Sequence, residues 1–127
     1  MIGAAARELT VQVSAGHSDA RLPVLRRAVA ATSSKAGLPV DRIDDALLIL
    51  EALLADSIAA HAEEIHLVLT ARPGCFAMMM GPFPGTDAQR LLAQAELPIV
   101  GRVIERLATS ATTVDDGSHL LIIVDAT

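Results

Sequence analysis

The segment Glu51-Ala52-Leu53-Leu54-Ala55-Asp56 carries two carboxylates late in a long amphipathic stretch. Positions i and i+4 of a helix share one face, so a metal ligand paired with Glu51 would stand at position 55. Ala55 cannot ligate a metal ion. Asp56 is a suitable Mg²⁺ ligand by type, but one further residue turns a helix by about 100°. From the residues alone, the two carboxylates do not share a helix face, and Glu51 is a solvated or partner-contacting carboxylate.

A second candidate is the loop 81–85, which follows the apolar run Cys75–Met80. Gly81 and Gly85 could let the backbone approach a ligand closely. Met79, two residues before Gly81, presents only a thioether, which is a weak hydrogen-bond acceptor. The alternative interpretation is a loop of prolines and glycines that binds nothing.

A third candidate is Gly101, which lies where a helix N-terminus could present backbone N–H groups to phosphate. Pro98, three residues earlier, lacks an N–H group. We therefore expect poor phosphate binding at this position.

In this order the three segments resemble the GHKL (Bergerat) ATP-binding domain, as found in the anti-sigma-factor serine kinases of bacterial partner-switching systems. In that family a Glu-Ala-x-x-Asn helix supplies a base and a Mg²⁺ ligand, and an Asp-x-Gly-x-Gly turn binds adenine. Glu51 and Gly81 match these motifs. Ala55 stands in place of the Asn, Met79 stands in place of the Asp, and Gly85 comes two residues late. The resemblance thus implies the family's scaffold with degenerate nucleotide motifs.

The resemblance implies an anti-sigma-factor-like regulatory protein that holds a sigma factor or an anti-anti-sigma factor, with ATP binding weak or lost and no cofactor. It also implies a homodimer. The first helix carries Arg21, Arg26 and Arg27 beside Leu22, and arginine next to apolar residues suits a protein interface. A solvated helix face is the alternative for these arginines.

Two other functions stay open. One is an active serine/threonine kinase that uses ATP and Mg²⁺, with Glu51 as base and Asp56 as metal ligand. The other is a small-ligand-binding module on the same scaffold, whose apolar pocket would be lined by Met78, Met79, Met80 and Phe83.

The composition of the chain limits the kinds of partner and metal ion that it is expected to bind. The net charge is −5, Lys35 is the single lysine, and the arginines are scattered, so direct nucleic-acid binding is disfavoured. Cys75 is the single cysteine, which excludes an internal disulfide and a cysteine-based zinc site. The four histidines share no ligand spacing, and no metal site is predicted.

The hydropathy of the chain predicts where in the cell the protein is located. No apolar run approaches the roughly 20 residues that span a bilayer, and residues 1–7 lack the basic-then-apolar order of a signal peptide. The sequence therefore predicts a cytoplasmic protein without membrane contact.

The helices and strands that position these residues can be predicted from hydrophobic periodicity and from turn residues. We expect strands at 8–13, 65–70, 75–80, 111–114 and 120–124, and helices at 20–36, 41–62 and 88–95. A further helix should open at Pro98, with Ile99 directed inward. The run 75–80 is apolar throughout, which predicts burial on both faces. Residues 1–127 are thus expected to form one α+β domain, a two-layer sandwich with a mixed β-sheet and helices on one face.

Overall fold

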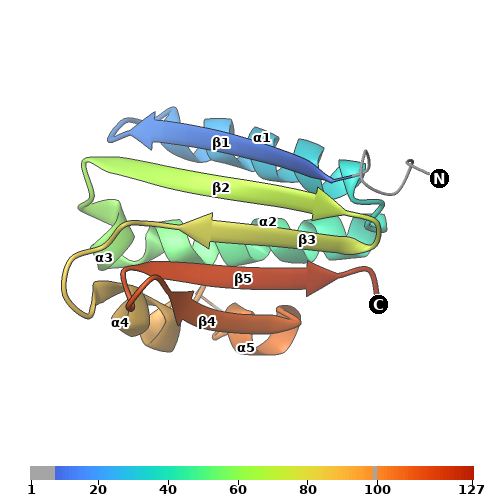
Figure 1. The fold of residues 1–127 in the computed structure, drawn as a ribbon. Coiled ribbons are helices and arrows are strands. Elements are labelled where there is room, and N and C mark those ends of the chain that lie inside the picture. The colour runs from blue at the N-terminus through green and yellow to red at the C-terminus, as the bar shows by residue number, and fades with distance from the viewer. Residues whose placement is uncertain (1–7, 99) are drawn as a thin grey trace.

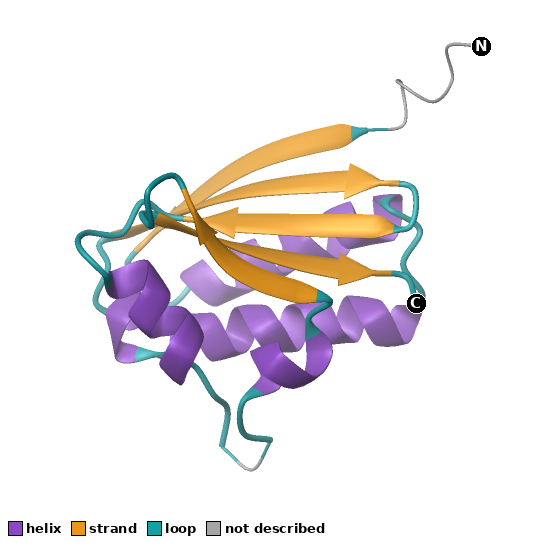
Figure 2. Cartoon of the chain, turned by 60° about the horizontal axis from the view of Figure 1, so that its bottom comes forward, coloured by secondary structure: helices purple, strands orange, loops and turns teal. Residues whose placement is uncertain are grey.

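The computed structural model describes residues 8–98 and 100–127 and has two layers, a β-sheet and a set of helices (Figure 1). The strands are β1 (Leu9–Gly16), β2 (Glu64–Arg72), β3 (Cys75–Met80), β4 (Ser110–Val114) and β5 (His119–Asp125). They lie in the order β1-β2-β3-β5-β4. The helices are α1 (Arg21–Lys35), α2 (Val40–Ala55), α3 (Ser57–Ala60), α4 (Asp87–Gln94) and α5 (Val103–Leu107). Figure 2 shows the helices on one face of the sheet, as expected for the α+β two-layer fold.

The expectation of a mixed sheet was wrong in one respect, because all four strand pairs are antiparallel. The reason lies in the connections. A single helix between two neighbouring strands returns the chain to its starting end and gives a parallel pair. Here two long helices, α1 and α2, separate β1 from β2, and the second helix reverses the direction once more.

The long helix expected over 41–62 is divided at Asp56. The backbone of Asp56 is extended (φ −69°, ψ 143°), and its side chain accepts a hydrogen bond from the backbone N–H of Ile58. Aspartate competes with helical hydrogen bonding in this way and favours the N-cap position. The apolar stripe continues across the break from Leu54 to Ile58, which is why periodicity alone predicted one helix.

The sheet buries one face. Side chains that point toward the helices are fully enclosed, among them Leu67, Leu69, Phe76, Met78 and Ile122. Burial alternates along β3, so the expected burial of this strand on both faces was wrong. Cys75, Ala77 and Met79 lie on the other face and are partly exposed.

The last helix begins later than expected. It opens at Val103 rather than Pro98, after a bridge between Leu97 and Gly101. Ile99, expected to point inward, lies outside the described residues. No helix among the described residues has the length and apolar character needed to cross a bilayer.

Candidate functional site

Glu51 lies on the side of α2 that faces α1. Its Oε1 atom forms an ion pair with Nη1 of Arg26 at 3.0 Å, and the side chains of Glu51 and Arg26 are 33% and 39% exposed. Ala55 lies beside it, together with Ser18, Leu22 and Leu54, in an open hollow of about 260 Å³. The carboxylate predicted as a general base is therefore held by an arginine of the neighbouring helix.

Arg21 lies next to this hollow but is buried, with 7% of its surface exposed. Its guanidinium donates hydrogen bonds to the backbone carbonyls of Gly16, Ala59 and Ala62. These bonds connect the end of β1 with the C-terminal end of α3 and the residues that follow it. The expectation of a partner contact at Arg21 is thereby corrected, because the side chain is used within the fold.

The other two arginines of α1 remain accessible. Arg26 is partly exposed in its pair with Glu51. Arg27 is exposed, and Val24, one helical turn away, is 43% exposed. The accessible surface of α1 therefore combines arginine with an apolar side chain.

Asp56 does not join Glu51. One carboxylate oxygen of Asp56, Oδ1, accepts the hydrogen bond from the Ile58 N–H at 2.9 Å and another from Nε2 of Gln94 at 3.2 Å. The carboxylate thus caps α3 and links it to α4. Within the part of the chain that the structure describes, no three His, Cys, Asp or Glu side chains come close enough to hold a metal ion together.

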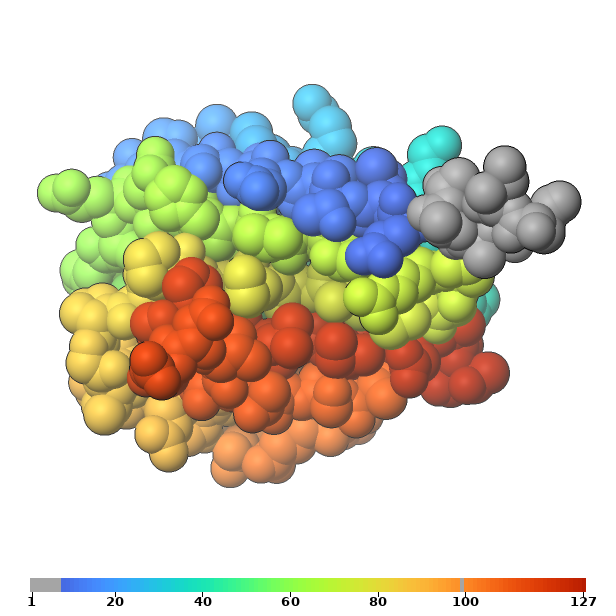
Figure 3. Space-filling view, in the orientation of Figure 1, coloured from blue at the N-terminus to red at the C-terminus, as the bar shows by residue number. Residues whose placement is uncertain are grey.

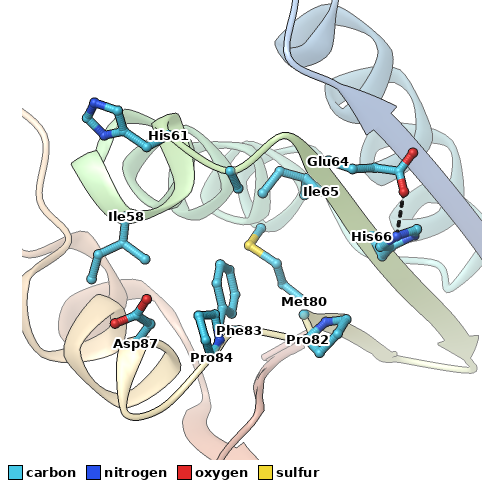
Figure 4. Close-up of a pocket in the computed structure, with 12 residues that line it drawn as sticks. Ile58, His61, Glu64, Ile65, His66, Met80, Pro82, Phe83, Pro84 and Asp87 are labelled. Atoms are coloured by element: carbon cyan, nitrogen blue, oxygen red, sulfur yellow. Dashed lines mark ion pairs between the residues drawn. The ribbon is translucent and has the colours of Figure 1, made fainter.

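Gly81 borders a different cavity, of about 270 Å³, between α3, the start of β2 and the loop after β3 (Figure 4). Its walls combine apolar side chains with the polar side chains of His61, Glu64 and His66. Met80 and Phe83 project toward the space between Ile58 and Ile65. Asp87 contributes a carboxylate at the first turn of α4.

One side of the Gly81 backbone is closed by His119. Its φ of +152° is one that L side chains rarely adopt, and a Cβ atom at this position would lie 2.7 Å from Cδ2 of His119. The imidazole ring of His119 therefore covers the glycine. The structure explains this glycine by a contact within the chain.

The remaining predicted residues lie elsewhere. Met79 points away from the helices, between Val68 and Leu121 of the neighbouring strands. Gly85 and Gly101 have φ values of +55° and +83°, and a Cβ atom at either position would meet no other atom within 4 Å. The positive φ values of these two turns therefore explain why both positions are glycine.

The structure therefore distributes the predicted site over separate places: Glu51 and Ala55 between α1 and α2, Gly81 at the apolar cavity, and Met79 on the open sheet face. Of the four residues expected to line an apolar pocket, Met80 and Phe83 do so, whereas Met78 is buried in the core. Sequence reasoning missed the roles of Arg21 and His119. Neither role has a local sequence signal, because Arg21 reaches the distant residues Ala59 and Ala62, and His119 lies against the distant Gly81.

No model of a protein family matches the chain, and no curated protein matches it. A small α+β domain with an antiparallel sheet is not diagnostic of the GHKL family. The family resemblance therefore stays a prediction.

Proposed function

We propose that the chain is a non-catalytic regulatory protein that binds a protein partner in the manner of an anti-sigma factor, the partner being a sigma factor or an anti-anti-sigma factor. The observation that carries the proposal is the separation of Glu51 from Met79. Glu51 lies in the helical layer, paired with Arg26, and Met79 points out of the opposite face of the sheet. One nucleotide cannot contact both.

The contacts that the Glu51 and Asp56 carboxylates already make support the same proposal. A general base must accept a proton from the attacking group, and Glu51 is already held in an ion pair with Arg26. A Mg²⁺ ligand must offer free oxygen lone pairs, and one oxygen of Asp56 already accepts two hydrogen bonds. An active kinase would have to break these contacts or use the second oxygen of each carboxylate.

The proposed partner surface is the accessible side of α1, with Arg27 and Val24 at its centre. Arginine is enriched among the residues that dominate binding energy in protein interfaces. Its contribution is largest where neighbouring apolar groups exclude water. The proposal places the protein in the cytoplasm, needs no cofactor, and includes a second copy of the chain as a further partner.

The partner surface can be tested with purified sigma factors and anti-anti-sigma factors from the host organism by biolayer interferometry. We expect one of them to bind, and the double variant Val24→Glu, Arg27→Glu to bind at least about tenfold more weakly. Val40→Glu is a matched control, because Val40 is 74% exposed and lies at the start of α2. Equal binding by the double variant and the control would contradict the proposed surface.

A second candidate function is favoured by the cavity at Met80 and Phe83. Its volume of about 270 Å³ and the apolar side chains in its walls suit a small ligand that is largely apolar. Saturable binding of an apolar fluorescent probe to the folded chain, lost in Ile58→Trp, would support this function. A probe signal that is equal in both proteins would argue against it.

A further inference from the structure

Three polar side chains meet on the sheet face that the helices leave open, where β1 and β2 lie side by side (Figure 3). The Oγ atom of Ser14 lies 2.5 Å from Nδ1 of His66, and Nε2 of His66 lies 2.7 Å from Oε1 of Glu64. One imidazole ring therefore contacts a hydroxyl group through one nitrogen and a carboxylate through the other. This is the order of nucleophile, base and orienting group that activates a serine.

The strand register brings these side chains together. Ser14 stands directly opposite His66 in the β1–β2 ladder, and Glu64 is two residues before His66 on β2, so all three share one face of the sheet. The residue opposite Glu64 is Gly16, which has no side chain that could separate the carboxylate from the imidazole. Ser14 and His66 are 52 residues apart in the chain, so no local pattern shows their contact.

The two contacts of His66 fix which nitrogen carries the proton in the neutral ring. A carboxylate only accepts hydrogen bonds, so Glu64 requires the proton on Nε2. Nδ1 then keeps its lone pair and accepts a hydrogen bond from the Ser14 hydroxyl group. The tautomer is thus assigned from the hydrogen-bond partners, and it is the one in which His66 can take the serine proton.

The backbone of Ser14 places a donor beside the hydroxyl group. Gly81 donates its N–H to the carbonyl of His66 at 3.2 Å, so the backbone groups of His66 point toward β3. Ser14 and His66 are therefore a non-hydrogen-bonded pair of the antiparallel ladder, and the N–H of Ser14 points away from β2. No described strand lies beyond β1, so this N–H faces the open edge of the sheet. The N–H of a nucleophilic serine can stabilise the oxyanion that forms at the attacked carbonyl group.

A second cluster of serine, histidine and carboxylate lacks this order. The Ser118 hydroxyl oxygen and the Asp115 carboxylate both contact Nδ1 of His119, at 2.8 and 3.5 Å. One nitrogen cannot accept a proton from Ser118 while it donates to Asp115. The Ser118 hydroxyl group also donates to the backbone carbonyl of Asp115 at 2.8 Å. Ser118 is therefore a matched control for Ser14 within the same chain.

We propose that Ser14 is a nucleophile that hydrolyses small apolar esters, with His66 as its general base and acid and Glu64 as a positioning residue for the imidazole. Oγ of Ser14 bonds to the ester carbonyl carbon, and its proton moves to Nδ1 of His66. The carbonyl oxygen takes the electron pair and accepts a hydrogen bond from the Ser14 N–H. When the pair returns, the bond to the alkoxide breaks, the alkoxide takes the proton from Nδ1, and an acyl-serine remains.

Water completes the reaction by the same route. Its oxygen bonds to the acyl carbon while one of its protons moves to Nδ1 of His66. The bond between the acyl carbon and Oγ of Ser14 then breaks, Oγ recovers the proton from Nδ1, and the carboxylic acid leaves. The side chains of His66 and Glu64 are 49% and 55% exposed, so water reaches them.

The adjoining cavity indicates the class of substrate. His66 and Glu64 form part of its wall, and Met80, Pro82 and Phe83 lie beside them (Figure 4). Its volume of about 270 Å³ suits a short apolar acyl group. The inference goes beyond the proposed function, which is non-catalytic with respect to phosphoryl transfer and uses the surface of α1, so either can fail alone.

The first measurement is covalent labelling of the full chain with an alkyl fluorophosphonate, located by peptide mass spectrometry. Oγ of an activated serine displaces fluoride from phosphorus. A positioned general base contributes about 100-fold or more, so we expect Ser14 to be labelled at least about 100-fold faster than Ser118. Labelling of Ser14 should be lost in His66→Ala. Equal rates at Ser14 and Ser118, or labelling of Ser14 that His66→Ala leaves unchanged, would overturn the inference.

The second measurement is the hydrolysis of p-nitrophenyl butyrate. Ser14→Ala keeps His66, so it reports any direct attack by the imidazole and serves as the background. We expect the wild-type chain to exceed this background about 100-fold and Ser118→Ala to match the wild type. Hydrolysis by the wild type that equals the Ser14→Ala background would overturn the inference.

Glu64→Gln tests the positioning role. The glutamine amide can donate to Nε2 of His66, which leaves the ring proton on Nδ1, where it blocks transfer from Ser14. We expect kcat to fall at least about tenfold, with KM and the urea midpoint unchanged. A purely structural role would move the urea midpoint instead. An unchanged kcat in Glu64→Gln would contradict the role given to Glu64.

Discussion

Arg21→Ala should be among the most destabilising single substitutions in the chain. The buried guanidinium donates to three backbone carbonyls, those of Gly16, Ala59 and Ala62. A hydrogen bond from a charged donor contributes about 1.5–3 kcal/mol. Two of the three bonds are only partly buried, and water can replace a lost donor there. We therefore expect a loss at or below the lower end of the sum for three such bonds, about 3–5 kcal/mol in the free energy of unfolding.

The assay is equilibrium unfolding in urea, followed by circular dichroism. With a denaturant slope of about 2 kcal/mol per molar, the midpoint should fall by about 2 M. Arg27→Ala is the matched control, because Arg27 is exposed on the same helix and should change stability by no more than about 0.5 kcal/mol. Arg21→Lys keeps the charge but loses the fork of donors, so it should fall between the two. Equal midpoints for Arg21→Ala and Arg27→Ala would refute the reasoning.

Two further predictions concern Gly81 and Cys75. Gly81→Ala should lower the free energy of unfolding by about 2–4 kcal/mol, because it adds strain at φ +152° and a contact with His119. Gly85→Ala, strained but without a close contact, should cost only about 1 kcal/mol in the same urea titration. Burial, with help from the Asp125 carboxylate, raises the pKa of the Cys75 thiol. Alkylation of dilute protein should therefore rise with pH through a midpoint above that of a free thiol, and Asp125→Asn should lower the midpoint; an unchanged midpoint would exclude the influence of Asp125.

Much of the fold could be predicted because local signals agree with it. The bounds of β3 follow from the turn at Pro73-Gly74 and from Gly81, and α1 follows from Leu25 and Val29 before Gly37. The division of the second helix could not be predicted from periodicity, since the apolar stripe passes through Asp56 without interruption.

The candidate site was harder to predict for a physical reason. Helical spacing shows that Glu51 and position 55 share a face, but not that this face meets Arg26 of α1. The apolar run of β3 has no alternation, so the sequence could not show that Met79 points away from the helices while Met78 and Met80 point toward them. Pairings between distant segments decide both questions.

The separation of Glu51 from Met79 is tested most directly by isothermal titration calorimetry of the full chain with Mg-ATP and Mg-ADP. The proposed function predicts no saturable heat at micromolar nucleotide. Saturable micromolar binding that disappears in Glu51→Ala and weakens in Asp56→Asn would contradict it, because these side chains would then hold a nucleotide and its metal ion.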